Sequence, residues 1–391
     1  MIYFIVLIVI LIPAIRYDFL LKKGGEEIWY YVNLIVLILL AGLRYRVGGD
    51  TGLYMQAFER LPTLSELSTF KFMNNYYMPL WYVYTAIFKS FGGYFLFQMV
   101  QAIIVNTTFL WFFRKKCSRY FTAIVVYFVS YYLCLNMDIL RQAICVCIFL
   151  LSYVLLEKKK LVWYYLMSIV AIGFHMSAIF LLIVPLVLIP RKEFIIIGIA
   201  LLSLIFVIRM NNFENVVVFV SERNFSVWKY YIIDRLNYYI NDSRLNIIGM
   251  MVRFLLCVPF LIVLTVKWCI WKKEDSLVDN MMLLLLFIQV SSIMFPMLGR
   301  FNQFLFPIGI VFLIKEISDN YEAIMSCKIA KLLVTIALFV YFFNISYGYV
   351  MNQYDYMEGA RVYHRYVPYH SVFNPVKDDF REDYLRNVHQ K

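Results

Sequence analysis

The chain has 391 residues, of which 63% are hydrophobic and 16% are charged, and its formal net charge is +12. A soluble domain carries about 25% charged and about 45–50% apolar residues, so this composition excludes a soluble globular fold. A backbone in lipid must form helices or closed barrels, and the apolar runs here are continuous rather than alternating. We therefore predict an all-α polytopic membrane protein with about twelve spans, folded as one membrane domain over residues 1–391.

The predicted spans are continuous apolar runs separated by basic or polar segments. They are Ile2–Ile15, Ile28–Leu43, Gly93–Phe113, Phe121–Leu135, Ile139–Leu156, Leu161–Phe174, Met176–Ile189, Phe194–Ile208, Ile247–Trp268, Met281–Phe295, Phe304–Ile314 and Leu332–Val350. The first run has no basic segment before it and no small-residue cleavage site, so we expect a retained span rather than a signal peptide. The apolar run Tyr76–Phe91 would make the number of crossings odd, and we interpret it as an interfacial or re-entrant helix on the outer side.

Short basic connections predict the orientation, because Lys and Arg beside spans remain in the cytoplasm. These connections contain Lys22-Lys23, Arg114-Lys115-Lys116 with Arg119, Lys158 to Lys160, Arg191-Lys192, Lys272-Lys273, and Lys328 with Lys331. Both termini then lie outside, together with the loops 44–75 and 209–246 and the tail 351–391. The positive charge is accounted for by topology and by contact with anionic membrane lipid, so nucleic acid is not an expected partner.

A dense polar motif, Arg44-Tyr45-Arg46-Val47-Gly48-Gly49-Asp50-Thr51-Gly52-Leu53-Tyr54, follows the second predicted span. Arginine forms paired hydrogen bonds to phosphate, and glycine lets backbone amides approach an anion closely. The alternative is that the arginines anchor the end of the helix while Asp50 caps the next one.

A second polar motif, Asn136-Met137-Asp138-Ile139-Leu140-Arg141-Gln142, joins two predicted spans. An ionised Arg in a transmembrane helix costs about 2.5–3.5 kcal/mol on insertion scales, so Arg141 should face a wet cavity or a partner. Asp138 stands three residues before Arg141, and a local pair between them is the structural alternative.

The third candidate is His175, in the middle of the apolar stretch Leu161–Ile189. A single helix over this stretch would be about 43 Å long, and both of its flanks are basic, so we expect the chain to fold back at His175. An imidazole at a recessed outer turn would suit proton transfer, because its unperturbed pKa is about 6.5. Alternatively, His175 satisfies a buried carbonyl group.

Other polar groups are less distinctive. Arg300 lies in a predicted outer turn with little other charge, and Arg253 lies inside a span, where a snorkelling structural role is favoured. The tail segment Tyr363–His370 mixes aromatic and polar residues, which suits sugar rings or the membrane interface. The chain has no P-loop, no G-x-S-x-G, no H-E-x-x-H and no D-x-D motif. The sequence thus predicts a cationic site without a metal or another cofactor, directed at an anion outside the cytoplasm.

Together these motifs resemble the EpsG family of Wzy-like polymerases. Residues 42–54 resemble its G-x-R-x-x-x-G-x-D-x-x-x-Y signature, Asn136–Gln142 its N-x-x-R-Q element and Phe174–Ser177 its F-H-x-S element. Arg300 before an aromatic run and Pro368-Tyr369 also fit, and the likeness covers most of the chain in order. Gly49 stands where Thr is common in the family.

The resemblance implies a multi-pass enzyme of the bacterial cytoplasmic membrane with a GT-C-like helical glycosyltransferase architecture. It would polymerise repeat-unit oligosaccharides carried on undecaprenyl pyrophosphate into exopolysaccharide, capsule or O-antigen, alongside flippase and chain-length regulator proteins. On this reading Arg44, Arg46, Arg141 and Arg300 bind the pyrophosphate, and His175 or Asp50 is the general base. The supporting residues are Gly48, Gly49, Tyr54, Asp138 and Gln142.

Two other functions remain open at this point. A flippase or exporter of lipid-linked oligosaccharide would share the cationic cavity, but it should show paired repeats, which the sequence lacks. A membrane O-acyltransferase would also use a His in apolar surroundings, although its donor site would normally be cytoplasmic.

Overall fold

The computed structural model describes residues 1–70, 77–210, 257–269, 271, 275–319, 341–343, 351 and 361–383. All named elements in these residues are helical, which confirms the predicted all-α class. Four helices among them are long and apolar enough to cross a membrane: Ile2–Phe19, Gly93–Lys116, Leu140–Glu157 and Gly299–Asp319. The count of about twelve spans and the GT-C-like architecture stay predictions.

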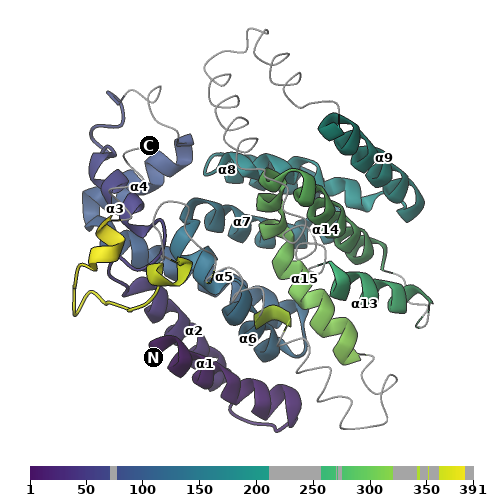
Figure 1. Ribbon diagram of the computed structural model, residues 1–391, viewed down its shortest axis with the longest axis horizontal. Helices are drawn as coiled ribbons and strands as arrows, with labels where there is room; N and C mark the ends of the chain where they lie inside the picture. The colour runs from purple at the N-terminus through teal and green to yellow at the C-terminus, as the bar shows by residue number, and fades with distance from the viewer. Residues whose placement is uncertain are drawn as a thin grey trace. The chain divides into compact units, whose positions relative to one another are not determined.

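The chain divides into two compact units, the first formed by Met1–Ile179 with Ile317–Lys391 and the second by Phe180–Glu316. The first unit holds the helices shown in purple to teal in Figure 1. They are α1 (Ile2–Pro13), α2 (Glu26–Gly42), α3 (Thr51–Arg60), α4 (Pro79–Phe91), α5 (Gly93–Lys116), α6 (Tyr120–Ser130), α7 (Leu140–Glu157) and α8 (Leu161–Ile172). Two π-helical segments, Ala14–Phe19 and Cys134–Asp138, extend α1 and precede α7.

The central helix of the first unit is α5, which packs against α2, α4, α6 and α7. Its buried polar side chains satisfy backbone groups where neighbouring elements end. The Gln98 amide donates to the carbonyls of Gly42 and Arg44, each at 2.8 Å, and the Gln101 amide donates to Leu140 O at 2.8 Å. Such side-chain bonds between apolar helices fix their register.

The predicted cytoplasmic basic residues gather at one end of this unit. Arg114, in the last turn of α5, pairs with Glu27 in the first turn of α2 at 2.6 Å. Lys116 pairs with Glu157 at the end of α7. These pairs bring the start of α2 together with the ends of α5 and α7, and the cytoplasmic location of this end stays a prediction.

Helix α4 lies at the opposite end of the unit and does not run between the ends. The Leu80 amide in its first turn donates to Gly173 O at 2.8 Å, beyond the end of α8. Lys89 in its last turn donates to Glu59 O at 2.7 Å, near the end of α3. This arrangement agrees with the interpretation of the run as an interfacial or re-entrant helix.

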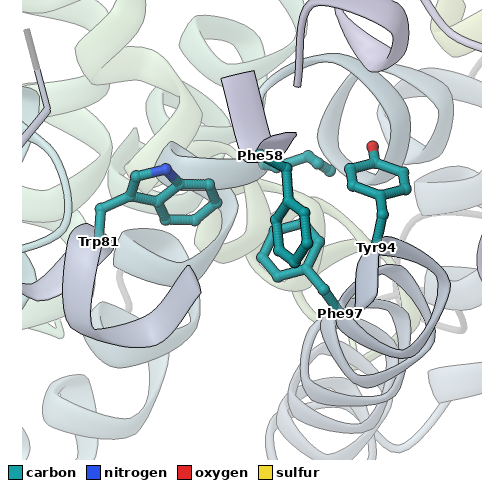
Figure 2. Close-up of a cluster of buried hydrophobic side chains, with 5 residues drawn as sticks. Phe58, Trp81, Tyr94 and Phe97 are labelled. Carbon is teal, nitrogen blue, oxygen red and sulfur yellow. The ribbon is translucent and has the colours of Figure 1, made fainter. Parts of the chain in front are cut away.

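A buried aromatic cluster holds α3 and α4 against α5 (Figure 2). The Phe97 ring lies 5.6 Å from each of the rings of Phe58 in α3 and Trp81 in α4. Tyr94 and Leu140 complete the cluster. Offset and edge-on ring pairs each stabilise a fold by about 0.5–1.5 kcal/mol beyond the effect of area burial. The cluster therefore stabilises the packing next to the polar loops that precede α3 and α7.

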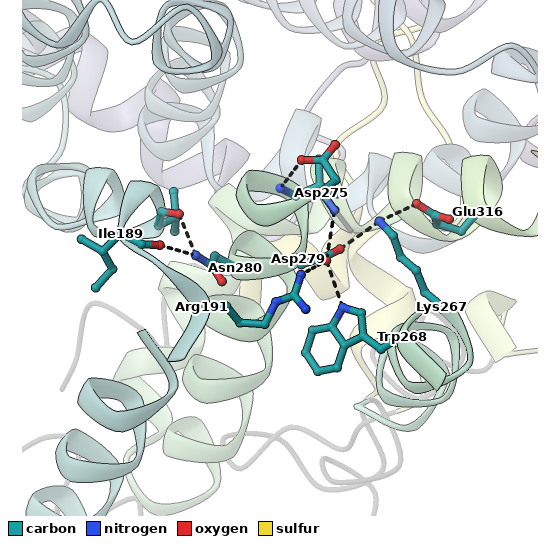
Figure 3. Close-up of polar contacts among 10 residues, drawn as sticks. Ile189, Arg191, Lys267, Trp268, Asp275, Asp279, Asn280 and Glu316 are labelled. Carbon is teal, nitrogen blue, oxygen red and sulfur yellow. Dashed lines mark hydrogen bonds and ion pairs between the residues drawn. The ribbon is translucent and has the colours of Figure 1, made fainter. Parts of the chain in front are cut away.

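The second unit contains α9 (Arg191–Met210), α13 (Val258–Cys269), α14 (Ser276–Met294) and most of α15 (Gly299–Asp319). A buried ion network joins one end of each of these helices (Figure 3). Asp279 pairs with Arg191 at 2.6 Å and with Lys267 at 2.9 Å, and Lys267 also pairs with Glu316 at 2.8 Å. The network places Arg191 beside the end of α13, as expected if both adjoining basic connections face the cytoplasm.

The predicted span Met176–Ile189 differs from the structure in helix type. It forms two 3₁₀ helices, Met176–Leu182 and Val184–Leu188, rather than one α-helix. A 3₁₀ helix rises about 2.0 Å per residue against about 1.5 Å in an α-helix, so a short run reaches further. Pro185 lacks a backbone N–H and favours this interruption. The loop 209–246, Arg253 and the span Leu332–Val350 lie almost entirely outside the described residues.

Candidate functional site

The loop after α2 is held in shape by Arg44, whose side chain is buried at 1% exposure. Its Nε donates to Val47 O at 3.1 Å, and its Nη1 donates to Ala41 O. Arg44 thus fastens the loop to the end of α2. Burial lowers the pKa of Arg44 because the charged guanidinium loses its water.

The next turn of the loop requires glycine at position 48. Gly48 has φ of +114°, and an added Cβ would lie 2.7 Å from Thr51 Oγ1 and 2.8 Å from Met137 O. The backbone is therefore both left-handed and too closely packed for a side chain. The Gly48 amide donates to Arg365 O at 2.8 Å, which brings the tail onto the loop.

Asp138 connects three distant parts of the chain. It is buried, and its Oδ1 accepts a hydrogen bond from the Gly49 amide at 2.5 Å. Its Oδ2 accepts from the hydroxyl of Tyr366, which is also buried. The carboxylate therefore ties the loop 43–50, called the glycine loop below, and the tail to the segment before α7.

The tail lies along the loop and the N-terminal helices, and it is the yellow segment in Figure 1. The Tyr45 amide donates to His370 O at 2.8 Å, and the Val372 amide donates to Leu43 O at 2.9 Å. The Tyr3 hydroxyl donates to Tyr366 O at 2.9 Å. The sequence predicts that the tail lies outside, but no local pattern in it indicates that the tail pairs with the glycine loop.

The first polar residue of the second motif, Asn136, is held by buried hydrogen bonds. The Asn136 amide donates to the Tyr127 hydroxyl at 2.8 Å, and its Oδ1 accepts from Asn106 of α5 at 2.9 Å. Asn136 and the predicted supporting residue Gln142 are both buried. Asn136 therefore fixes the chain immediately before Asp138 to the central helix.

Arg141 is half-buried at the start of α7 and lies against two tyrosines. Its guanidinium carbon is 4.7 Å from the centroid of the Tyr77 ring. It also hydrogen-bonds the hydroxyl of Tyr54. The negative charge of the Asp50 carboxylate acts electrostatically on the same hydroxyl. Burial raises the pKa of Tyr54, so this hydroxyl stays protonated at neutral pH. The structure thus gathers the predicted site residues Asp50, Tyr54 and Arg141.

His175 occupies the expected turn, between the end of α8 and the 3₁₀ helix Met176–Leu182. The Ser177 amide donates to His175 Nδ1 at 3.1 Å, and Ser177 Oγ lies 2.7 Å from the same nitrogen. Because Nδ1 accepts a backbone hydrogen bond, the neutral ring carries its proton on Nε2. This tautomer favours donation from Nε2 over uptake of a proton there.

The His175 turn belongs to the same end of the first unit as Arg141. The amide of His175 donates to Ala171 O at 3.2 Å, and Ala171 O is also 3.1 Å from Cys145 Sγ of α7. Cys145 is one helical turn beyond Arg141. Arg300, by contrast, belongs to the second unit, where its side chain is exposed at the start of α15. Its predicted contact with a pyrophosphate stays a prediction.

A basic pocket lies between the glycine loop and the tail. Its floor contains Gly48, Gly49 and Gly52, and its walls contain the side chains of Arg46, Arg365 and Arg381. Arg46 was a predicted phosphate ligand, whereas the two tail arginines were missed. The signal that could have suggested them was the run of basic and aromatic residues around Pro368-Tyr369.

Arg46 already has an acidic partner in this pocket. Its Nε and Nη2 face the two carboxylate oxygens of Glu382 at 2.6 and 2.8 Å. The Nη2 contact is a hydrogen bond and the Nε contact is an ion pair, so the guanidinium faces the carboxylate as it would face phosphate oxygens. The Nε and Nη2 side of the Arg46 guanidinium, called the Arg46 fork below, therefore suits an anion with two neighbouring oxygens. Glu382 occupies it in this structure.

A family model described as the EpsG family matches residues 27–371. The chain belongs to the EpsG family. Wzy-like polymerisation of polysaccharide is the general function of that family. The matched residues include the glycine loop, Asp138, Arg141 and His175, and they end before Arg381. No curated protein and no solved structure matches the chain.

Proposed function

We propose that this EpsG-family protein joins oligosaccharide repeat units carried on undecaprenyl pyrophosphate, at the outer face of the bacterial cytoplasmic membrane. The product would be a surface polysaccharide such as an exopolysaccharide, a capsule or an O-antigen. Flippase and chain-length regulator proteins would supply the substrate and set the product length.

The observation that carries the proposal is the meeting of separate motifs at one end of the first unit. Gly49 and Asp138 share a hydrogen bond of 2.5 Å, and Arg141 contacts both Tyr54 and Tyr77. These contacts gather guanidinium, carboxylate and hydroxyl groups from segments far apart in the sequence. Such a set suits transfer of a sugar from an anionic leaving group to a hydroxyl.

In the proposed reaction a sugar hydroxyl of one repeat unit attacks the anomeric carbon of another. The new C–O bond forms as the bond to the lipid pyrophosphate breaks, and the hydroxyl proton passes to a base. Arg141 would stabilise the charge that develops on the departing pyrophosphate, so that no metal or other cofactor is required.

Asp50 is the stronger of the two proposed bases. It lies half-buried at the start of α3, close enough to act on the Tyr54 hydroxyl that bonds Arg141. His175 would serve instead as a donor through Nε2, because Ser177 occupies Nδ1. Arg44 and Asp138 would act as positioning residues, since both bind the loop that carries Asp50.

The test is to delete the gene and separate the surface polysaccharide by size on a gel. A polymerase predicts that the ladder collapses to material with a single repeat unit, and that the intact gene restores it. Loss of all surface material, including the single unit, would instead indicate a flippase. An unchanged ladder that differs only in acyl groups would indicate an O-acyltransferase.

A further inference from the structure

The pocket between the glycine loop and the tail has features that the proposed roles of Asp50, Arg141 and His175 do not use. Arg381 lines this pocket and is 5% exposed, in a part of the tail beyond the residues that the family model matches. Its Nε donates to His364 O at 3.2 Å, and its Nη2 donates to Pro368 O. Neither carbonyl carries a charge, and the nearest carboxylate acting on Arg381, that of Asp378, accepts from its backbone amide.

The third nitrogen of the Arg381 guanidinium, Nη1, is also buried. Among the residues that the structure describes, Nη1 has no hydrogen-bond partner. Burial lowers the pKa of Arg381, because its charged form is poorly solvated there. An anion bound in the pocket would satisfy this donor and offset the loss of water.

Arg365 supplies a second guanidinium to the lining of the same pocket. A Cβ added to Gly49 would lie 2.7 Å from Arg365 Cδ and 2.9 Å from its Cζ. The side chain therefore lies directly over the bare backbone of Gly49. Absence of a side chain at this position leaves the space in which Arg365 rests.

The space now open in the pocket is little larger than a water molecule. A larger anion can enter only if a wall group moves away. Glu382 is the group best suited to leave, because its carboxylate holds the Arg46 fork and its side chain is 24% exposed. An incoming oxyanion would take the place of the Glu382 carboxylate on the Arg46 guanidinium.

We propose that this pocket binds an oxyanion with two or more oxygens, held by Arg46, Arg365 and Arg381, and that Glu382 occupies Arg46 until the anion arrives. The identity of the anion rests on the proposed polymerase function. It would be the pyrophosphate of the lipid carrier or the carboxylate of an acidic sugar in the repeat unit.

The experiment measures binding by the full-length protein in detergent at low salt, by calorimetry. The probes are inorganic pyrophosphate, glucuronate and, as the neutral comparison, glucose. Saturable binding of pyrophosphate alone indicates the lipid carrier, and binding of glucuronate alone indicates an acidic sugar. Saturable binding of both supports an oxyanion pocket open to either source. Binding of neither anion overturns the proposal.

The variants test which residues form the pocket. Arg365→Gln and Arg381→Gln should each weaken binding of the anion by about tenfold or more, as expected when a charged hydrogen bond is lost. Glu382→Gln should strengthen binding, because Arg46 no longer has an internal carboxylate to release. Arg60→Gln is the matched control, since it removes an exposed arginine of α3 away from the pocket.

Arg381 also holds the tail, so its variant could act by releasing that segment. Gly49→Ala avoids this difficulty, because it keeps all three arginines and only displaces the Arg365 side chain. It should weaken binding while leaving the tail resistant to brief proteolysis. Wild-type affinity in Gly49→Ala and Arg365→Gln, or weaker binding in Glu382→Gln, would overturn the proposal. These measurements do not depend on polymerisation, so they stand apart from the gel that tests the function.

Discussion

Gly49 and Asp138 are 89 positions apart in the sequence, yet the amide of the first donates to the carboxylate of the second at 2.5 Å. The other oxygen of that carboxylate accepts a hydrogen bond from the hydroxyl of Tyr366. One buried side chain therefore joins the glycine loop, the start of α7 and the tail.

We expect Asp138→Asn to disrupt the site even though it keeps the size of the side chain. An amide offers one oxygen, so it leaves either the Gly49 amide or the Tyr366 hydroxyl facing an NH₂ group. A buried donor left without an acceptor costs about 1–3 kcal/mol. Polymer ladders should be lost, and the tail should become sensitive to brief proteolysis. A ladder of normal length together with a protected tail would contradict this account of Asp138.

Arg141→Lys should abolish most polymerisation while the protein still accumulates in the membrane. Lysine keeps the charge over the Tyr77 ring, but it cannot offer the planar pair of donors that suits phosphate oxygens. The readout is the polysaccharide ladder normalised to protein level. Arg60→Lys, the same exchange at an exposed position, should leave the ladder intact. A near-normal ladder from Arg141→Lys would remove Arg141 from the proposed chemistry.

Two substitutions of His175 distinguish the roles of its two ring nitrogens. Asparagine can still accept the Ser177 amide through its oxygen, but it has no group at the position of Nε2. His175→Asn should therefore keep the turn and reduce polymerisation by about 100-fold or more, the usual effect of losing an acid or base group. Glutamine reaches towards the Nε2 position and can donate there, so His175→Gln should retain more activity than His175→Asn. Equal and complete loss in both variants would point back to His175 as the base.

The orientation of the first unit can be tested by cysteine labelling in a cysteine-depleted background. Phe373 is 81% exposed in the tail, next to the glycine loop, and Lys158 is exposed at the opposite end after α7. Phe373→Cys should react with a membrane-impermeant maleimide in intact cells stripped of their outer layers. Lys158→Cys should react only after the membrane is opened. The reverse pattern would refute the predicted topology.

The ion network of the second unit should matter for stability rather than for chemistry. The Asp279 side chain is fully buried, between Arg191 and Lys267. Removing one member of a buried charge group costs about 3–5 kcal/mol, because the others are left uncompensated. Asp279→Asn should lower the melting temperature of the detergent-purified protein markedly. Glu27→Gln breaks the exposed pair with Arg114, which is worth about 0–1 kcal/mol. This variant should change the melting temperature little. Similar melting temperatures for both variants would contradict this role.

The sequence by itself determined the helical class, the ends at which basic residues gather, and the motifs around Asp50, Arg141 and His175. These features follow from local patterns, since apolar length, basic flanks and glycine pairs act within a few residues of one another. The turn at His175 was predictable for the same reason. The 3₁₀ form of the segment that follows it was not, because helix type depends on packing as well as on composition.

Only the tertiary structure decided which groups each arginine contacts. From the sequence, Arg44 and Arg46 are two residues apart and equally suited to bind phosphate. In the structure Arg44 bonds the carbonyls of its own loop, while Arg46 faces Glu382, which is 336 positions away. Arg365 and Arg381 enter the pocket only because the tail pairs with the glycine loop. A guanidinium bonds to the oxygen atoms that lie near it. Which oxygens those are depends on the packing of distant chain segments, and no local sequence pattern encodes that packing.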